Sequence, residues 1–526
     1  MAAVNGFCGC FPKELSVNKW TDAAAAVGQI FDGATIALAG SGGGLLEADA
    51  VLAQLEKRFL ETGHPRDLTI VHALGIGDAK GSGLGRFAHE GMVKRVIGGH
   101  WSWAPAMQKL ARDNAFEAYS FPAGAISTLL REIGAGRPGL VTHVGLRTFV
   151  DPRIDGGKIN ERASEDLVEL IELDGREFLR YKPFKVDFAI VRGSSADESG
   201  NVTLRREPAD LDVYAAALAA HNSDGRVIVQ VKERAPEGYV PARLVRIPGI
   251  LVDTLVETPE QVQCVVSDYD AALSGEALCT IGEGFYEVPT GIRRIIAARA
   301  ALELYEGQSA NFGFGIPGGI PALLAEQGRL GTFWGSVEQG IHNGAMLDGP
   351  MFGTARNAHA ILSSVDQFDF YSGGGVDVSF LGMGEMDGAG NINVSKLGST
   401  VVGPGGFIDI TQGARKIVFC GSFEAKGLDV EQAGTRLKIV SPGSVPKLVE
   451  RVQHITFSGE QALRSAQEVL YVTERAVFRL EAEGVRLIEV ADGVDIERDV
   501  LARMAFRPLL DAALLARMSA AQEKVA

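Results

Sequence analysis

The sequence predicts an α/β protein built from two similar open domains, each with a mainly parallel sheet. Short apolar segments alternate with helical stretches along the whole chain, which is the pattern of strand–helix–strand units. The chain has 526 residues, of which 46% are hydrophobic, so it can bury a large core and is too long for one ordinary domain. The two halves also repeat one strand-and-turn pattern in the same register.

The expected strands are short apolar runs that alternate with longer helical stretches. Strands are predicted at residues 34–39, 68–71, 227–229 and 416–419. Helices are predicted over residues 47–61, 290–305 and 320–326. The second of these helices begins directly after Pro289, a residue that suits a helix start.

The internal repeat joins an apolar strand to the same kind of turn in each half. In the first half, Val186-Asp187 precedes a strand and the turn Asp197-Glu-Ser-Gly-Asn-Val202. In the second half, Val376-Asp377 precedes a strand and the turn Asp387-Gly-Ala-Gly-Asn-Ile392 at the same spacing. Asp and Asn bond to nearby backbone and Gly permits positive φ, so the turn itself is a structural feature. The repeat indicates a duplication, and two unrelated strand–turn units are the alternative.

A boundary near residues 280–290 divides the chain into predicted domains over residues 1–285 and 286–526. Ligands of open α/β domains bind beyond the carboxyl ends of the strands, so we expect a site shared between the two halves. The glycine-rich turns at residues 41–44 and 313–317 suit a phosphate or carboxylate, because backbone N–H groups at a helix start favour negative charge. Neither turn is a Walker motif or a G-x-G-x-x-G fingerprint, so a tight structural turn is the alternative at each.

The composition excludes several functional classes. A net charge of −15 argues against binding of a nucleic-acid backbone, although a small anionic ligand can still bind at a local patch. No apolar run approaches the roughly 20 residues of a membrane-spanning helix, and the first residues lack a signal pattern. We therefore expect a cytoplasmic protein without membrane or nucleic-acid partners. The cysteines are few and scattered, and reduced thiols are expected at Cys8, Cys10, Cys264, Cys279 and Cys420.

Two common catalytic patterns are missing from the sequence. The histidines show no metal-ligand spacing such as H-E-x-x-H, so no metal is expected. No G-x-S-x-G elbow follows a strand, which argues against a serine hydrolase.

The candidate nucleophile is Glu338, which follows a short apolar strand in Trp334-Gly-Ser-Val-Glu-Gln-Gly340. A carboxylate can attack a thioester, because a thiolate is a good leaving group and the resulting anhydride is itself reactive. An exposed loop acid is the alternative. Two glycine runs downstream could bring backbone N–H groups to a developing oxyanion, with tight turns as the alternative. These runs contain Gly373, Gly374 and Gly375, and then Gly403, Gly405 and Gly406.

Longer blocks of the sequence resemble one enzyme family. In the first half, the blocks cover residues 63–69, 89–91, 94–101, 149–153 and 156–160. In the second half, they cover residues 368–371, 373–375, 393–398, 405–408, 471–475 and 506–508. The blocks occur in family order over nearly the whole chain, and they are similar to family I CoA-transferases of the single-chain acetate/propionate and 3-ketoacid type.

The resemblance implies two tandem CoA-transferase domains and a ping-pong transfer of CoA from an acyl-CoA to a short-chain acid of acetate, propionate or 3-ketoacid type. The family nucleophile lies in a Glu-x-Gly stretch ahead of the triple glycine, and only Glu338 matches that place. It would form an acyl-glutamyl anhydride and then a glutamyl-CoA thioester. Gly406 matches the glycine whose N–H faces the oxyanion. The loop with Gly313 and Gly315 would lie near the thioester and pantetheine. Coenzyme A is implied as a substrate, with no further cofactor, and relatives form homodimers or homotetramers.

Three stretches depart from the family pattern. Ala123 stands where relatives have a Gln that contacts the reacting carboxylate, and residues 41–44 lack the usual aromatic and proline. His342 and Asn343 follow the nucleophile where relatives are small and Gly-rich. These two residues could contact a polar acyl group or donate to the oxyanion, with loop packing as the alternative. Together the changes predict a carboxylate partner other than plain acetate or propionate.

Two other functions fit the same residues. An acyl-CoA hydrolase would use the same glutamate and let water resolve the intermediate. A non-catalytic ligand-binding protein is the other, because fold does not fix function. Only the missing Gln at position 123 favours the non-catalytic protein, whereas Glu338 and both glycine runs are intact.

Overall fold

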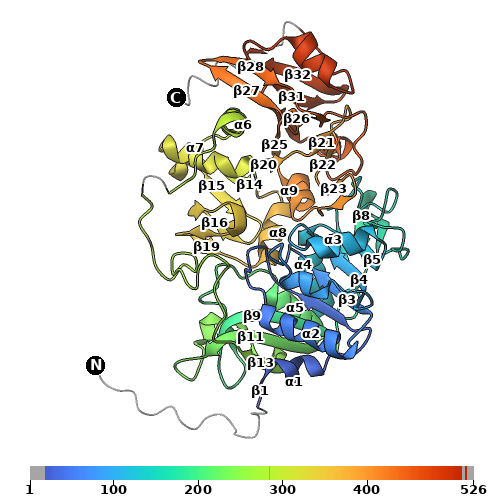
Figure 1. Cartoon of the computed structure of the whole chain (residues 1–526), viewed down its shortest axis with the longest axis vertical. Coiled ribbons are helices and arrows are strands. Elements are labelled where there is room, and N and C mark those ends of the chain that lie inside the picture. Colours follow the sequence, from blue (N-terminus) through green and yellow to red (C-terminus); the bar gives the residue numbers. More distant parts are fainter. Residues whose placement is uncertain (1–17, 283–284, 512–515, 518–526) are drawn as a thin grey trace.

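The computed structural model describes residues 18–282, 285–511 and 516–517, in which the chain forms two ten-stranded sheets. The first sheet uses residues 20–257 and the second uses residues 309–517. Figure 1 shows them in the blue-to-green and the yellow-to-red parts of the molecule. Apart from residues 283–284, which are not described, no helix or strand lies between Glu257 and Gly291. The predicted α/β class with two mainly parallel sheets is confirmed.

The first sheet is parallel along its main path, whose order is β1-β13-β11-β9-β2-β3-β4-β5. Its strands are β1 Trp20–Thr21, β2 Thr35–Leu38, β3 Leu68–His72, β4 Val93–Gly98, β5 Glu117–Ser120, β9 Phe188–Ala196, β11 Arg226–Arg234 and β13 Thr254–Glu257. An antiparallel edge is added by β10 Val202–Thr203 and β12 Val245–Ile247. Strands predicted at residues 34–39, 68–71 and 227–229 correspond to β2, β3 and β11. Every residue of β9 is buried, as expected for a strand covered on both faces.

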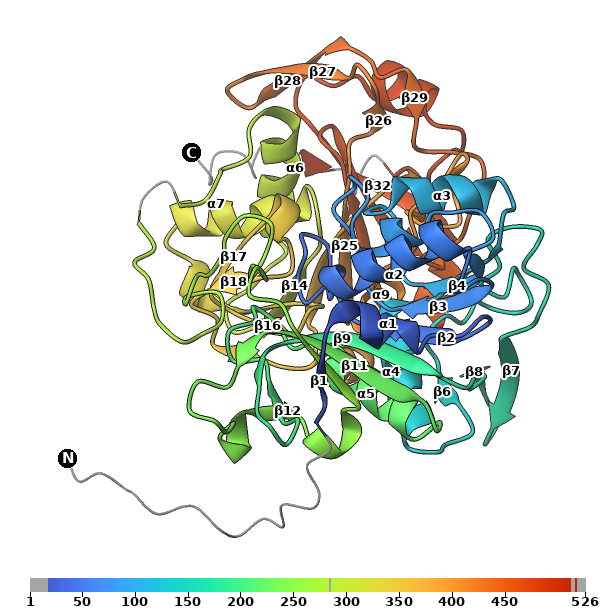
Figure 2. The same cartoon turned by 60° about the horizontal axis from the view of Figure 1, so that its bottom comes forward.

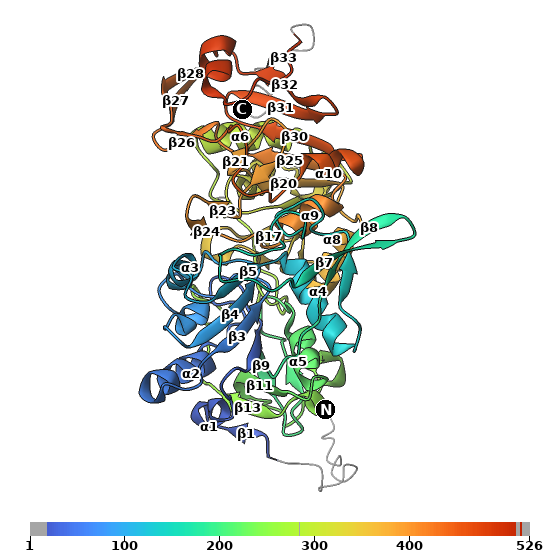
Figure 3. The same ribbon diagram turned by 90° about the vertical axis from the view of Figure 1, so that its right-hand side faces the viewer.

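Helices cover both faces of the first sheet, with α1, α2 and α3 on one side and α4 and α5 on the other (Figure 3). Their bounds are α1 Ala23–Gly28, α2 Asp49–Thr62, α3 Pro105–Arg112, α4 Ala123–Gly134 and α5 Val213–His221. The helix predicted over residues 47–61 is α2. Helix α4 is buried along almost its whole length, because α5 packs on it from its own domain and α8 from the second domain.

The second sheet has the order β19-β16-β15-β14-β20-β25-β30-β31-β32-β33. Its central strands β15, β14, β20, β25 and β30 are parallel. Most of the flanking pairs are antiparallel, an extension that the sequence did not predict. The strands are β14 Ser309–Phe312, β15 Trp334–Val337, β16 Ile341–His342, β19 Ala360–Ile361, β20 Val378–Gly382, β25 Lys416–Cys420, β30 Glu468–Val472, β31 Ala476–Glu481, β32 Gly484–Val490 and β33 Ala516–Arg517. The strand predicted at residues 416–419 is β25.

The helices of the second domain complete the contact with the first. They are α6 Gly291–Ala301, α7 Ile320–Glu326, α8 Ser364–Ser372, α9 Phe407–Gly413 and α10 Gly459–Arg464. Of these, α6 is shorter than the predicted 290–305, and α7 coincides with the predicted 320–326. Helices α8 and α9 lie against α4 between the two domains (Figures 1 and 3).

Both domains also contain smaller antiparallel elements. A three-stranded sheet of β6 Leu140–Thr142, β7 Val168–Leu173 and β8 Arg176–Tyr181 extends from the side of the first domain (Figure 2). Two-stranded pairs are formed by β17 Ala345–Met346 with β18 Ala355–Arg356, β21 Glu385–Met386 with β22 Ile392–Asn393, β23 Lys396–Leu397 with β24 Thr400–Val401, β26 Glu424–Ala425 with β29 Val445–Pro446, and β27 Asp429–Ala433 with β28 Arg436–Ser441. None of the described helices has the length and apolar character that a bilayer crossing requires.

The cysteines are separate from one another in the part of the chain that the structure describes. Cys264, Cys279 and Cys420 are free thiols. Cys8 and Cys10 lie outside the described residues.

Candidate active site

Glu338 directly follows β15, at the carboxyl ends of the parallel strands of the second sheet. The neighbouring strands β14 and β20 end at the same edge, at Phe312 and Gly382. Glu338 lines an internal chamber of about 530 Å³. Burial raises the pKa of its carboxyl group to about 7, although a hydrogen bond from the Gly406 N–H acts in the opposite direction.

Gly406 approaches Glu338 more closely than any residue with a side chain could. Its backbone N–H donates to Glu338 Oε2 at 2.9 Å. A Cβ at position 406 would lie 2.1 Å from the same oxygen. The backbone φ at Gly406 is −84°, which residues other than glycine also adopt. Glycine is therefore required here by the close approach to Glu338 and not by the backbone conformation.

The chamber lies between the two domains. The wall from the first domain includes Gly42, Leu74, His100 and Trp103. The wall from the second domain includes Phe312, Gly313, Phe314, Gln339 and residues 402–407. The expectation of a site shared between the two halves therefore agrees with the geometry around Glu338.

Backbone hydrogen bonds hold the loop before Gly406 against the first domain. The Gly405 N–H donates to the Gly99 carbonyl at 2.8 Å, and the Ala123 N–H donates to the Gly405 carbonyl at 2.8 Å. Gly403 has a φ of +80°, and a Cβ there would lie 2.5 Å from the Gly99 oxygen. The position of the Gly406 N–H therefore depends on residues of both domains.

A second buried carboxyl group, that of Asp409, joins helix α9 to the start of helix α4. Asp409 is 1% exposed, and its Oδ2 accepts the Gly124 N–H at 3.1 Å. Helix α4 has no side-chain cap of its own at Pro122, so a residue of the other domain takes that role. Burial raises the pKa of Asp409. The hydrogen bond from the Gly124 N–H lowers this pKa, and the nearby Glu338 raises it further.

A hydrogen-bonded group of neutral side chains lies behind Glu338. Asn311 Nδ2 donates to the Tyr371 hydroxyl at 3.1 Å, and that hydroxyl donates to Ser336 Oγ at 3.1 Å. Ser379 Oγ donates to Asn311 Oδ1 at 3.2 Å. These contacts join β14, β15, α8 and β20, and they fix the strand end that carries the nucleophile candidate.

The structure brings together only part of the predicted site. Gly313, Gly403, Gly405 and Gly406 line the chamber with Glu338. Gly315 lies farther along the same loop and Ala123 is fully buried beside Gly99, and neither lines the chamber. Ala123 contributes its backbone N–H to the loop at Gly405, as described above, and no side-chain donor.

The triple glycine Gly373–Gly375 occupies a different place from the predicted one. It follows α8 and precedes β20, so it lies at the amino end of that strand, whereas Glu338 lies at the carboxyl end of the parallel neighbours. The N–H groups of Gly374 and Gly375 bond to the Tyr371 and Phe370 carbonyls and close the end of α8. The expectation that they supply oxyanion donors is therefore corrected: their donors are used at the helix end.

His342 and Asn343 also point away from the chamber lining. The Trp334 indole N–H donates to His342 Nδ1 at 2.8 Å, and the Gly335 N–H donates to Asn343 Oδ1 at 2.7 Å. Both residues thus brace the edge of β15, which corresponds to the loop-packing alternative.

Sequence reasoning missed four residues around Glu338. His100, Trp103 and Gln339 line the chamber, and Asp409 adjoins it. His100 and Asp409 lie within or beside the sequence blocks that carried the family resemblance, and Gln339 is the neighbour of Glu338. Only the fold shows which of their side chains face the site.

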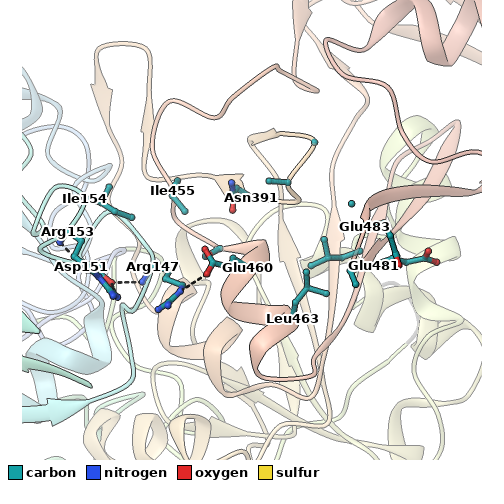
Figure 4. Close-up of a pocket in the computed structure, with 16 residues that line it drawn as sticks. Arg147, Asp151, Arg153, Ile154, Asn391, Ile455, Glu460, Leu463, Glu481 and Glu483 are labelled. Atoms are coloured by element: carbon teal, nitrogen blue, oxygen red, sulfur yellow. Dashed lines mark hydrogen bonds and ion pairs between the residues drawn. The ribbon is translucent and has the colours of Figure 1, made fainter. Parts of the chain in front are cut away.

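A larger cavity of about 710 Å³ lies elsewhere between the domains. Figure 4 shows Arg147 joined to Glu460 and Arg153 beside Asp151, while Glu481 and Glu483 lie apart from this group. The Arg147 Nε–Glu460 distance is 3.0 Å and the Arg153–Asp151 distance is 2.7 Å. Both arginines that line this cavity are therefore paired, and its described lining offers no free cation.

No group of three or more His, Cys, Asp and Glu side chains is placed to hold a metal ion in residues 18–282 and 285–511. The chemistry available at the chamber is that of a carboxylate with a raised pKa, held by a backbone N–H donor.

Comparison with known proteins identifies the family. Residues 20–258 match the family model described as Coenzyme A transferase. Acetate CoA-transferase YdiF of Escherichia coli strain K12 is 39% identical over 92% of this chain and 91% of its own length. Caffeate CoA-transferase of Acetobacterium woodii is 42% identical over 94% of this chain and 96% of its own length. The crystal structure of acyl-CoA transferase YdiF from E. coli O157:H7, in a thioester complex with CoA, matches with a TM-score of 0.90 and 37% identity over 97% of both chains. The chain therefore belongs to the family I CoA-transferases and is a CoA-transferase.

Proposed function

We propose that this enzyme moves CoA from an acyl-CoA to a carboxylic acid by a ping-pong reaction in which Glu338 carries CoA as a thioester. The observation that supports this role is the contact between Glu338 Oε2 and the Gly406 N–H at 2.9 Å, inside a chamber shared by both domains. The thioester complex named for YdiF of E. coli O157:H7 is consistent with such an intermediate.

The first half of the reaction exchanges two acyl bonds. The ionised Glu338 carboxylate attacks the carbonyl carbon of the acyl-CoA, and the CoA thiolate leaves to give an acyl-glutamyl anhydride. The thiolate then attacks the glutamyl carbonyl carbon, and the donor acid leaves as its carboxylate. The enzyme is left as glutamyl-CoA. The acceptor carboxylate reverses these steps and departs as the new acyl-CoA.

Gly406 is suited to stabilise charge during these exchanges. When thiolate or carboxylate adds to the glutamyl carbonyl, negative charge develops on the glutamyl oxygen. The Gly406 N–H already lies 2.9 Å from one of these oxygens, so little reorganisation is needed. The burial that raises the pKa of Glu338 also leaves the carboxylate poorly solvated and therefore a better nucleophile when ionised.

We infer that CoA acts as a substrate and that the steps require no further cofactor, because each one exchanges an acyl group between a carboxylate and a thiolate. The acids are short-chain carboxylic acids, and the absence of a Gln side chain at Ala123 favours a partner other than plain acetate or propionate. Acetate and caffeate appear in the names of the two relatives, and they are suitable first acceptors to compare.

Mass spectrometry of the intact enzyme tests the covalent step. Incubation with acyl-CoAs in the absence of an acceptor should add CoA to the peptide that contains Glu338, and hydroxylamine should release it. Glu338→Gln and Glu338→Ala should remain unmodified while retaining the fold, as judged by circular dichroism. An adduct on either variant would contradict the assignment. Loss of thioester without an acceptor, at the rate seen with one, would favour a hydrolase.

A further inference from the structure

The chamber around Glu338 is almost free of charge. Apart from Glu338, the only ionisable side chain among the lining residues is His100, and none of these residues is Lys, Arg or Asp. Burial lowers the pKa of His100 to about 4, with a smaller effect from His72, so the imidazole is neutral at pH 7. A ligand in this chamber therefore meets no cation.

Two polar side chains in the chamber wall lack protein partners. Gln339 is 3% exposed, and neither its acceptor Oε1 nor its donor Nε2 has a hydrogen-bond partner among the described residues. A Cβ on Gly353 would lie 2.2 Å from Gln339 Cδ, so this amide is packed tightly against the backbone. No described residue forms a hydrogen bond to the ring of His100, which lines the same chamber. Buried polar groups normally have partners, so the unpaired amide of Gln339 beside a nucleophile indicates a ligand, and the half-buried His100 ring is free to contact the same ligand.

His100 and Glu338 face the same point from opposite domains. His100 Cδ2 and Glu338 Oε1 both lie 3.9 Å from the position that a Cβ on Gly405 would occupy. His100 is also fixed from behind, because a Cβ on Gly75 would lie 2.6 Å from His100 Nδ1 and 2.7 Å from Trp103 Cδ1. The imidazole is thereby held next to the reacting carboxylate without a salt bridge or hydrogen bond to the protein.

The rest of the chamber presents apolar and aromatic surface. Trp103 comes from the first domain, while Phe314 and Phe352 come from the second. The rings of Phe314 and Phe352 meet edge to face with centroids 5.5 Å apart. Such walls favour an apolar chain, with a few polar groups to orient it.

We propose that the chamber selects monocarboxylic acids with an uncharged, apolar chain, and that His100 and Gln339 bind the carboxylate oxygen that does not attack the thioester. This inference rests on the proposed role of Glu338 as the carrier of CoA. One carboxylate oxygen of the acceptor forms the new bond to the glutamyl carbonyl carbon as thiolate leaves. Neutral donors from His100 and Gln339 hold the other oxygen, in place of the side chain that Ala123 does not supply.

The same geometry disfavours dicarboxylic acids. A second carboxylate would enter a largely apolar chamber beside Glu338 and would find no Lys or Arg to neutralise it. An unpaired charge in such surroundings is strongly disfavoured. A comparison of butyrate, succinate and monomethyl succinate as acceptors separates the effect of charge from that of size. Succinate carries a second charge, whereas its monomethyl ester is again a monoanion and is slightly longer.

The acceptor test begins with enzyme loaded by butyryl-CoA and freed of excess donor. Discharge of the Glu338–CoA adduct is followed at pH 7.5 with each acid, against a blank without acceptor. Succinate should react at least about tenfold more slowly than butyrate, and monomethyl succinate should recover most of the difference. Equal rates with succinate and butyrate would overturn the selection for monocarboxylic acids. Failure of butyryl-CoA to form any Glu338 adduct would overturn the proposed function as well, which distinguishes the two failures.

The residue test uses His100→Leu and His100→Gln, with Gln339→Leu as a second probe. His100→Leu should raise the KM for butyrate about tenfold, because the carboxylate loses one neutral donor, and His100→Gln should recover part of it. His143→Leu removes a half-buried imidazole of the same domain outside the chamber, and it should leave the KM unchanged. Circular dichroism and adduct formation verify the fold of each variant. A butyrate KM within twofold of the wild-type value in both leucine variants would refute the assigned contacts.

Discussion

The two domains share one backbone framework and differ in what stands at the end of one strand. In the first domain, Asp187 Oδ2 accepts the Thr35 N–H at 3.0 Å, and in the second, Asp377 Oδ2 accepts the Ser309 N–H at 2.9 Å. The sheet order β11-β9-β2-β3 of the first domain corresponds to β25-β20-β14-β15 of the second. The duplication inferred from the sequence is therefore visible in hydrogen bonds and in topology.

The difference lies after β3 and β15. In the first domain β3 is followed by Ala73, Leu74 and Gly75, whereas in the second β15 is followed by Glu338, Gln339 and Gly340. Gly75 of the first domain leaves room for His100 and Trp103, which form the facing wall. One copy of the framework thus carries the reactive carboxylate, and the other copy shapes the space in front of it.

The largest predicted effect on kcat distinguishes Gly406 from Gly374, two glycines for which the sequence predicts the same role. Gly406→Ala places a Cβ 2.1 Å from Glu338 Oε2, so it should displace the carboxylate and lower kcat by roughly 10²–10³-fold. Gly374→Ala meets no atom closer than 3.9 Å, but φ there is +86°. It should lower the free energy of unfolding by about 1 kcal/mol and leave kcat near the wild-type value. Steady-state kinetics and denaturation of both variants measure these changes. A large loss of kcat in Gly374→Ala would show that the triple glycine contributes to catalysis after all.

The two glycine runs also show what a sequence can and cannot place. The positions of several strands and the strand end before Glu338 were predictable, because apolar runs and turn residues mark them locally. Gly374 and Gly375 precede β20, so they lie at the opposite edge of the sheet from Glu338. Their N–H groups donate to carbonyls at the end of α8. The expected contact of His342 and Asn343 with the acyl group or the oxyanion fails for a similar reason. Strand pairing places these two side chains against Trp334 and Gly335.

Asp409 offers a test of how strongly the two domains cooperate. Asp409→Ala leaves the Gly124 N–H without its acceptor and loosens the loop that carries Gly406, so kcat should fall roughly 10–100-fold. Asp409→Asn retains an oxygen acceptor and should lose much less. Asp212→Ala is a matched control, since Asp212 is also buried and accepts a hydrogen bond from Ser127 of the same helix α4 at 3.2 Å. Equal losses in the Asp409→Ala and Asp212→Ala variants would reduce Asp409 to a general packing role.

Asp409 could not be assigned from sequence, because its role is to cap a helix of the other domain. Within the sequence it is one acid in the first turn of α9, where acids are common. Only the assembled pair of domains places it against Gly124. The same holds for His100, which lies against Gly403 and Gly405 of the second domain.

The pH dependence should report Glu338 and no group of the opposite wall. The nucleophile is the ionised carboxylate, whose pKa is raised to about 7, so kcat/KM should rise with pH through about 7 and level off above it. One unit below this pKa, about a tenth of the carboxylate is ionised and the rate should fall about tenfold. His100, with its pKa lowered to about 4, should contribute no inflection in this range. A kcat/KM that stays level from pH 8 to pH 5 with an acceptor that remains ionised would contradict the raised pKa.

The smallest effect is expected at the duplicated turns, where the two domains are equivalent. Asp197 Oδ1 accepts the Ser199 and Asn201 N–H groups at 3.0 and 2.9 Å, and Asp387 Oδ1 accepts two N–H groups of its own turn at 3.0 and 3.1 Å. Replacing either Asp by Ala leaves partly buried donors unpaired and should cost about 1 kcal/mol of local stability, with kcat unchanged.

Hydrogen exchange with mass spectrometry can locate this loss. Asp197→Ala should increase exchange in β9 and β11, and Asp387→Ala should increase it in β20 and β25. Because the two sites lie in different sheets without shared partners, the double variant should show the sum of the single effects. If either substitution instead loosened both sheets equally, the domains would unfold as one unit. The duplicated framework would then be a single cooperative body, and the contrast between its reactive and its shaping half would lie in side chains alone.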